Sequence, residues 1–356
     1  MKPWLKGIGL TFLGLLGLLM LAVVVVYFGT SGDYSVPATV VHDPELPALE
    51  VNGVRLHAES FGDKSKPLVV VLHGGPGDDY RMLLPLQALA DEYHLVFYDQ
   101  RASGLSERVP DDLITLDHFL DDLAGIIKHF AAPDAPVVLL GHSWGAMLAS
   151  SYIGRHPQSI SAAVLAEPGF LTPAQAERFI ETVGTSPPVS WQTAKSMLRA
   201  WGESMHIEEG DEHVRMDYMM LRLMMTPVPG HPMAGYFCDE DLSTAVLDHW
   251  RFGAAASPAL FAQAVDDNGK FTIDLSAGVD QFTGPVLFLT SSCNRLIGEE
   301  FQKEHLPLFQ KATQQVIQGS GHTMFGEQPI KSVAAVRAFL QKSLAPPAAE
   351  EPVVVP

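Results

Sequence analysis

The stretch Gly141-His142-Ser143-Trp144-Gly145 decides the fold of this chain. It follows the apolar run 136–140, which predicts a strand, and precedes the small apolar residues 146–149, which predict the start of a helix. Because glycine tolerates backbone conformations that other residues avoid, the flanking glycines permit a tight turn that lifts the serine hydroxyl above the sheet edge. We therefore predict that Ser143 is a nucleophile at a strand-to-helix turn.

A glycine-rich turn precedes this serine in the chain. The sequence His-Gly-Gly-Pro-Gly at residues 73–77 closes the β-rich run 68–72. Backbone N–H groups in such a turn can point at the negatively charged oxygen that forms when a nucleophile attacks a carbonyl group. We expect the amides of Gly75 and Trp144 to share this oxyanion, with Gly74 as a further donor.

A third motif, Asp-Gln-Arg-Ala-Ser-Gly-Leu-Ser at residues 99–106, follows another predicted strand at 94–98. In this order the three motifs resemble those of the proline iminopeptidase family of α/β-hydrolases. The resemblance covers roughly residues 47–344 and is closer before residue 168 than after it. It implies a Ser-Asp-His triad, release of an N-terminal residue (often proline) from peptides, and a helical cap whose carboxylates hold the free amine. Sequences that share these motifs also include amidases, esterases and lactone-type hydrolases.

The general base follows from chain order. In hydrolases of this type the nucleophile, the acid and the histidine succeed one another along the chain, with the histidine in a loop after the last strand. His322 ends the small-residue loop 318–322, which follows the strand-like run 314–317. We therefore assign His322 as the general base and expect His142, beside the nucleophile, to be a packed neighbour.

The triad acid is where the sequence departs from the family pattern. Asn294 stands in the loop after the next-to-last strand, where relatives carry an aspartate. An amide can orient an imidazole, but it cannot stabilise an imidazolium by charge. Glu167 follows the strand-like run 161–166 at the same carboxyl edge of the sheet, where some α/β-hydrolases carry their acid. Glu167 is therefore the first candidate for the acid and Asn294 the alternative, and the third option is an acid elsewhere in the chain or none. If Glu167 has no catalytic role, we expect it to cap a helix or to face water.

Helical, methionine-rich sequence replaces the strand pattern over residues 168–284, which predicts a cap inserted into the hydrolase core. Its carboxylates Glu203, Glu208 and Glu209 are candidates to bind a cationic amine of the substrate. The alternative is that these charges belong to solvated helix faces. Several cap methionines recur at helical spacing, which predicts packing onto the core or the wall of an apolar pocket. They are Met216, Met219, Met220, Met224 and Met225.

The order of the predicted elements indicates an α/β-hydrolase fold with a mostly parallel, doubly wound sheet. The core occupies residues 47–167 and 285–344, and it begins with a hairpin whose turn is Asn52-Gly53. A tether covers residues 30–46, and a disordered tail covers residues 345–356.

The N-terminal segment predicts a transmembrane signal anchor. Residues 7–29 carry no charge, and residues 10–28 are almost wholly apolar. Such a run is long enough to cross a hydrocarbon core of about 30 Å. Lys2 and Lys6 precede it, so the positive-inside rule predicts a cytoplasmic N-terminus and a periplasmic or extracellular catalytic domain. The alternative is a signal peptide that is cleaved to release a secreted protein.

Composition limits the partners. The net charge of −18 repels nucleic acid, which we exclude as a partner. We expect a small-molecule or peptide substrate and, through the N-terminal helix, a membrane; the sequence predicts no oligomeric state. It contains no metal-binding motif, and we expect no cofactor. The two cysteines, Cys238 and Cys293, either pair or remain buried thiols.

Three hypotheses of function follow. The first is a membrane-anchored serine hydrolase that cleaves an amide or ester through an acyl-enzyme. Within this hypothesis, aminopeptidase action on N-terminal proline ranks first, and hydrolysis of a small apolar ester or lactone ranks second. The second is a pseudoenzyme that binds a ligand in the same pocket, motivated by Asn294. The third is a structural or partner-binding domain, which no sequence feature supports directly.

Overall fold

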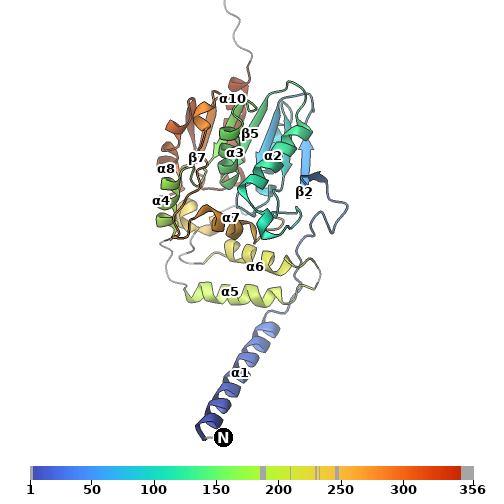
Figure 1. Cartoon of the computed structure of the whole chain (residues 1–356), viewed down its shortest axis with the longest axis vertical. Coiled ribbons are helices and arrows are strands. Elements are labelled where there is room, and N and C mark those ends of the chain that lie inside the picture. Colours follow the sequence, from blue (N-terminus) through green and yellow to red (C-terminus); the bar gives the residue numbers. More distant parts are fainter. Residues whose placement is uncertain are drawn as a thin grey trace, which may run out of the picture.

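One mixed sheet runs through the centre of the molecule (Figure 1). The computed structural model describes residues 3–184, 190–208, 210–228, 231, 233–244 and 248–345. Its strands are β1 (Ala48–Val51), β2 (Val54–Phe61), β3 (Leu68–Leu72), β4 (His94–Tyr98), β5 (Val137–His142), β6 (Ala162–Ala166), β7 (Val286–Ser291) and β8 (Ala312–Ile317). Within the described residues these eight strands pair in the order β1-β2-β4-β3-β5-β6-β7-β8. β2 is antiparallel to β1 and β4, and the other pairs are parallel.

Continuous apolar runs form the inner strands. Every residue of β3, β4 and β6 is buried, because parallel strands covered by helices on both faces have no solvent side. β8 lies at the edge of the sheet and alternates between half-buried and exposed residues as far as its last residue, Ile317, which is buried. The carboxyl ends of the parallel strands meet at one edge, so the motifs that follow them come together there.

Helices cover both faces of the sheet. One apolar cluster joins α2 (Leu116–Phe130) and α3 (Trp144–Arg155) to one face, and another joins η1 (Arg81–Leu89) and α10 (Pro329–Ser343) to the other. In α2, the Thr115 side chain caps the first turn, and apolar residues recur every three or four positions on the buried side. The other helices are α1 (Pro3–Gly29), α4 (Pro173–Gly184), α5 (Trp191–Ser204), α6 (Val214–Met225), α7 (Ala256–Ala264), α8 (Glu299–Lys303), α9 (Met324–Glu327) and the short turns η2 (Asp111–Leu113), η3 (Ala234–Tyr236), η4 (Cys238–Glu240), η5 (Leu242–Thr244), η6 (Val279–Gln281) and η7 (Leu306–Leu308).

The N-terminal helix α1 meets α5 near its own C-terminal end (Figure 1). Nε2 of His206 donates a hydrogen bond to the carbonyl oxygen of Tyr27 at 2.8 Å. In the part of the chain that the structure describes, no helix is long and apolar enough to span a membrane, which takes about 20 apolar residues. The predicted anchor over residues 7–29 is therefore not supported, and neither is the membrane as a partner. The predicted single-pass location, with a cytoplasmic N-terminus and an exterior catalytic domain, is wrong.

The segment between β6 and β7 carries α4, α5, α6 and α7 and is covalently tied to the core. Cys238 and Cys293 form a disulfide, which decides between the alternatives that the sequence left open. Cys238 belongs to η4, and Cys293 follows β7, so the bond joins the inserted segment to the sheet. Of the predicted tail at 345–356, residues 346–356 lie outside the described part of the chain.

A buried group of charges also joins this segment to the core. Asp217 on α6 accepts hydrogen bonds from the guanidinium groups of Arg108 and Arg251. Arg251 in turn donates to Asp211 and to the carbonyl oxygen of Pro37 in the tether. Because Asp217 and Arg251 are almost fully buried, their lost hydration is offset only while each keeps its partners.

Replacing Asp217 by alanine is expected to lower the free energy of unfolding by about 3–5 kcal/mol, since two guanidinium groups lose their common partner. Asp117 is the matched control, because its ion pair with Arg155 is exposed. We expect Asp117→Ala to cost less than about 1 kcal/mol. Urea unfolding followed by circular dichroism measures both values. Equal losses in the two variants would show that the buried group contributes no more than a surface ion pair.

Candidate active site

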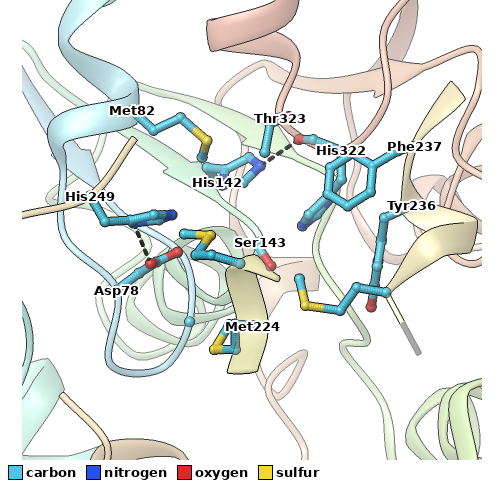
Figure 2. Close-up of a pocket in the computed structure, with 13 residues that line it drawn as sticks. Asp78, Met82, His142, Ser143, Met224, Tyr236, Phe237, His249, His322 and Thr323 are labelled. Carbon is cyan, nitrogen blue, oxygen red and sulfur yellow. Dashed lines mark hydrogen bonds and ion pairs between the residues drawn. The ribbon is translucent and has the colours of Figure 1, made fainter. Parts of the chain in front are cut away.

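Ser143 lies in the turn between β5 and α3, at the carboxyl edge of the sheet. Its backbone angles are φ 54° and ψ −119°, a conformation that a residue with a side chain adopts only where the surrounding structure imposes it. The turn is tight, because a Cβ on Gly145 would lie 2.2 Å from the carbonyl oxygen of Leu72. Ser143 therefore stands at the wall of a cavity above the sheet (Figure 2).

The glycine-rich turn after β3 lies beside the serine. A Cβ on Gly74 would come within 3.2 Å of the Cβ of Ser143. Gln100 joins the two segments: its side-chain amide donates to the carbonyl oxygen of His73 at 2.9 Å and accepts from the indole N–H of Trp144 at 2.8 Å. Gln100 therefore clamps the turn to the residue after the serine, a role that the sequence motif alone did not reveal.

His322 and Glu167 form a buried pair. Nδ1 of His322 donates to Oε2 of Glu167 at 2.8 Å, and the glutamate side chain is fully buried. Oε1 of the same carboxylate accepts from the backbone N–H and the hydroxyl of Ser291, at 2.7 and 2.6 Å. Hydrogen bonds to both oxygens therefore hold the carboxylate in one orientation toward the imidazole.

Asn294 contacts Glu167 and not the histidine. Its Nδ2 donates to Oε2 of Glu167 at 2.8 Å, while its Oδ1 accepts from the amides of Leu296 and Ile297, both at 3.0 Å. β6 and β7 are neighbours in the sheet, so the loops that follow them meet. The two acid positions considered from the sequence therefore lie together, with Glu167 between the imidazole and Asn294.

His142 supports the loop of His322. Its Nε2 donates to the carbonyl oxygen of His322 at 2.8 Å. Burial, and then the neighbouring ring of His322, lower the pKa of His142 to about 3, so this ring is neutral. His142 therefore fixes the backbone of His322 without adding charge to the site.

Residues 69–336 match the sequence pattern of the alpha/beta hydrolase family, and this range includes Ser143, Glu167 and His322. This chain belongs to the alpha/beta hydrolase family. It is thus a hydrolase by family, and the fold that the motif order predicted is confirmed.

Curated relatives support the predicted resemblance. A proline iminopeptidase of Heyndrickxia coagulans is 35% identical over 127 residues, which cover 35% of this chain and 43% of that protein. Epoxide hydrolase 1 of Caenorhabditis elegans is 23% identical over 305 residues, which cover 83% of this chain and 70% of that protein. The chain therefore spans less than half the length of the proline iminopeptidase that it matches.

Solved structures share the fold. The proline iminopeptidase of Mycobacterium smegmatis aligns with a TM-score of 0.55 at 17% identity, over 83% of this chain and 97% of that one. A membrane phospholipase A, a bacterial virulence factor, aligns with a TM-score of 0.58 at 18% identity, over 96% of this chain and 99% of that one. At these identities the similarity to the solved structures shows the fold alone. The predicted resemblance to proline iminopeptidases is confirmed by the family match and the curated relatives.

In this α/β-hydrolase, Ser143, His322 and Gly75 line one cavity of about 230 Å³ (Figure 2). Of the cap methionines singled out in the sequence, Met224 and Met225 belong to its wall. The rest of the wall is mainly apolar. It includes Met82, Met233, Tyr236 and Phe237.

One ion pair interrupts the apolar wall. Nδ1 of His249 lies 2.8 Å from Oδ1 of Asp78 (Figure 2). Burial alone would lower the pKa of His249, but the contact with Asp78, together with the charges of Asp79 and Asp248, outweighs burial and raises the pKa to about 9. Asp79 accepts from the backbone N–H groups of Trp250 and Arg251, which fixes this part of the inserted segment to the loop after β3. Neither Asp78 nor His249 was predicted from the sequence to be a site residue, because only the fold brings the two together.

The cap carboxylates expected to bind an amine do not line this cavity. Glu203 is buried and accepts from Nε of Arg199 at 2.7 Å and from Nε of Arg222 at 3.1 Å. Its charge is therefore already neutralised. Glu208 is exposed to solvent, and Glu209 lies outside the described residues. Among the described residues, the cavity thus lacks a free cap carboxylate.

Proposed function

We propose that this α/β-hydrolase is a serine hydrolase that cleaves carboxylic esters with an apolar acyl group. The observation that carries the proposal is a serine on a strained turn, in an apolar cavity shared with a histidine that is bonded to a buried carboxylate. An apolar acyl group gains free energy when it leaves water for a wall of methionine and aromatic side chains. The charged groups described in that wall, Asp78 and His249, are already paired with each other.

The reaction begins when Oγ of Ser143 attacks the ester carbonyl carbon and Nε2 of His322 accepts the hydroxyl proton. The carbonyl oxygen becomes an oxyanion, which accepts hydrogen bonds from the amides of Gly75 and Trp144, with Gly74 as a further donor. His322 then gives the proton to the departing alkoxide, and the alcohol leaves an acyl-enzyme behind. Water then attacks the acyl carbon while His322 takes a proton from the water. The bond between this carbon and Oγ of Ser143 breaks, His322 returns the proton to Oγ, and the carboxylic acid leaves.

Glu167 acts as the triad acid in this proposal. Its charge stabilises the imidazolium that exists while His322 holds the proton, and its hydrogen bond selects the productive tautomer of the ring. Asn294 keeps the carboxylate in position and does not touch the imidazole. The reason for a ligand-binding pseudoenzyme was an amide in place of the acid, and the contact between Glu167 and His322 removes that reason.

Aminopeptidase action on N-terminal proline is the second candidate. It is supported by the partial identity to a proline iminopeptidase and by one carboxylate in the cavity wall, that of Asp78. The ammonium group of a peptide would replace His249 as the partner of this carboxylate. Ester hydrolysis ranks first because Asp78 is already paired and Glu203 is neutralised by two arginines.

Three substrates separate the two candidates: an aryl butyrate, a proline arylamide with a free amine, and the same arylamide with its amine blocked. For the full-length protein we expect the largest kcat/KM with the ester, and equal low values for the two arylamides, because no unpaired carboxylate awaits the ammonium group. A preference of more than about tenfold for the free amine, lost in Asp78→Asn, would instead establish the aminopeptidase.

A further inference from the structure

A second cavity lies within the inserted segment, behind the wall of the first. It has a volume of about 270 Å³, and its wall comes from α5, α6 and the residues that follow α6. Met224 and Met233 belong to the walls of both cavities, so these two side chains separate the spaces (Figure 2 labels Met224). We call the second space the distal chamber. Its other wall residues are Thr193, Ser196, Met197, Leu223, Thr226, Val228 and His231.

Polar groups in the wall of the distal chamber bond to the wall itself. Nε2 of His231 donates to the carbonyl oxygen of Leu223 at 3.2 Å, and Nδ1 accepts from the backbone N–H of Met233 at 3.1 Å. The hydroxyl of Thr226 donates to the carbonyl oxygen of Arg222. The side chains of His231 and Thr226 are therefore hydrogen-bonded without a ligand. The space is partly open to solvent, since its wall residue Met197 is exposed, and a largely apolar wall of this kind favours an apolar occupant that removes it from water.

The partition between the two cavities is adaptable. Methionine has an unbranched, polarisable side chain with three rotatable bonds, so it adjusts its shape to a ligand at low cost. Met224 and Met233 are both half-buried. The backbone N–H of Met233 donates to Nδ1 of His231, which fixes the backbone at this point. Rotation of the two thioethers would open a path from Ser143 into the distal chamber without a change in the backbone.

We propose that the distal chamber binds the far end of a long acyl chain whose ester carbonyl lies at Ser143. The inference rests on the proposed ester hydrolysis and adds the substrate class: esters of long-chain fatty acids are preferred over short-chain esters. The distal chamber roughly doubles the space that the first cavity of about 230 Å³ offers, because it adds about 270 Å³. Each methylene that it buries raises kcat/KM by about fourfold.

A chain-length series tests the proposal. With the full-length protein and aryl esters of butyrate, octanoate, laurate and palmitate, we expect kcat/KM to rise with chain length. Met197→Trp fills the distal chamber from α5, and its matched control is Leu198→Trp, since Leu198 is in neither wall and the two side chains are similarly exposed, at 42% and 48%. Met197→Trp should lower the ratio of laurate to butyrate kcat/KM by about tenfold or more, and Leu198→Trp should leave it unchanged.

Butyrate hydrolysis serves as the internal check, because the short ester does not reach the distal chamber. If Met197→Trp also loses butyrate hydrolysis through misfolding, Val228→Phe fills the same space from the other side. An unchanged ratio in a folded variant would overturn the inference and leave ester hydrolysis standing. A wild-type protein that hydrolyses none of the four esters would overturn the proposed function, and the inference with it.

Discussion

The Ser143→Ala variant is expected to lose covalent labelling by a fluorophosphonate probe and to show a kcat about 10⁶-fold below that of the wild type. The probe phosphonylates a serine only when a base removes its proton, so labelling reports the activated nucleophile directly. Ser143 stands at the end of a strand on a turn with positive φ, in the same cavity wall as His322. Mass spectrometry of the labelled peptide identifies the modified residue.

Ser150→Ala is the control for this variant. Ser150 lies on α3, the helix that begins after Ser143; it is fully buried, and its hydroxyl donates to the carbonyl oxygen of Ala146. It should retain labelling and turnover, because its hydroxyl is already bonded within the helix and does not line the cavity. Labelling that persists in Ser143→Ala would point to another nucleophile. Wild-type protein that is folded but never labelled would restore the pseudoenzyme hypothesis.

Much of the sheet was predictable because its strands are buried on both faces. The runs at 68–72 and 137–140 are apolar throughout, the run at 94–98 is apolar after His94, and the structure makes all three inner strands. The Asn52-Gly53 dipeptide was equally informative. Both residues have positive φ, as the tight turn between β1 and β2 requires. These features are local, so a single sequence contains them.

The contact between Glu167 and His322 was not predictable, because it depends on strand order. Glu167 and Asn294 each follow a predicted strand, and the missing charge of Asn294 ranked Glu167 first without showing that its side chain reaches His322. Only the pairing of β6 with β7 shows that their loops meet, and that the longer side chain reaches His322 while the shorter one supports it. Strand order is a long-range property that the residues around each position do not encode.

The partners of the cap carboxylates were left out of the sequence prediction. Glu203 was one candidate to bind an amine, but Arg199 lies four residues before it, a spacing at which opposite charges pair on a helix. That spacing was visible in the sequence and would have predicted a neutralised glutamate. Arg222, which completes the neutralisation from α6, required the helix packing. The partnership of Asp78 with His249 likewise has no local signature.

Glu167→Gln is expected to lower kcat by about 10⁴-fold while leaving the fold intact. The substitution keeps the shape of the side chain but removes the charge that stabilises the imidazolium of His322. It also creates a conflict of donors: Oε2 now accepts from Nδ1 of His322 and Nδ2 of Asn294, and a glutamine N–H₂ in that position can accept from neither. The histidine would then lose its productive tautomer or its fixed orientation.

Asn294→Ala is the comparison that ranks the two acid positions. It removes one hydrogen bond to Glu167 and leaves the amides of Leu296 and Ile297 without their acceptor, so its main effect should be a loss of about 1–3 kcal/mol in the free energy of unfolding. Because the bond between His322 and Glu167 survives, kcat should fall by less than about tenfold. Steady-state kinetics and urea unfolding on both variants separate catalysis from stability. A larger loss of kcat in Asn294→Ala than in Glu167→Gln would transfer the orienting role to the amide, and Glu167 would then serve the packing of the two loops.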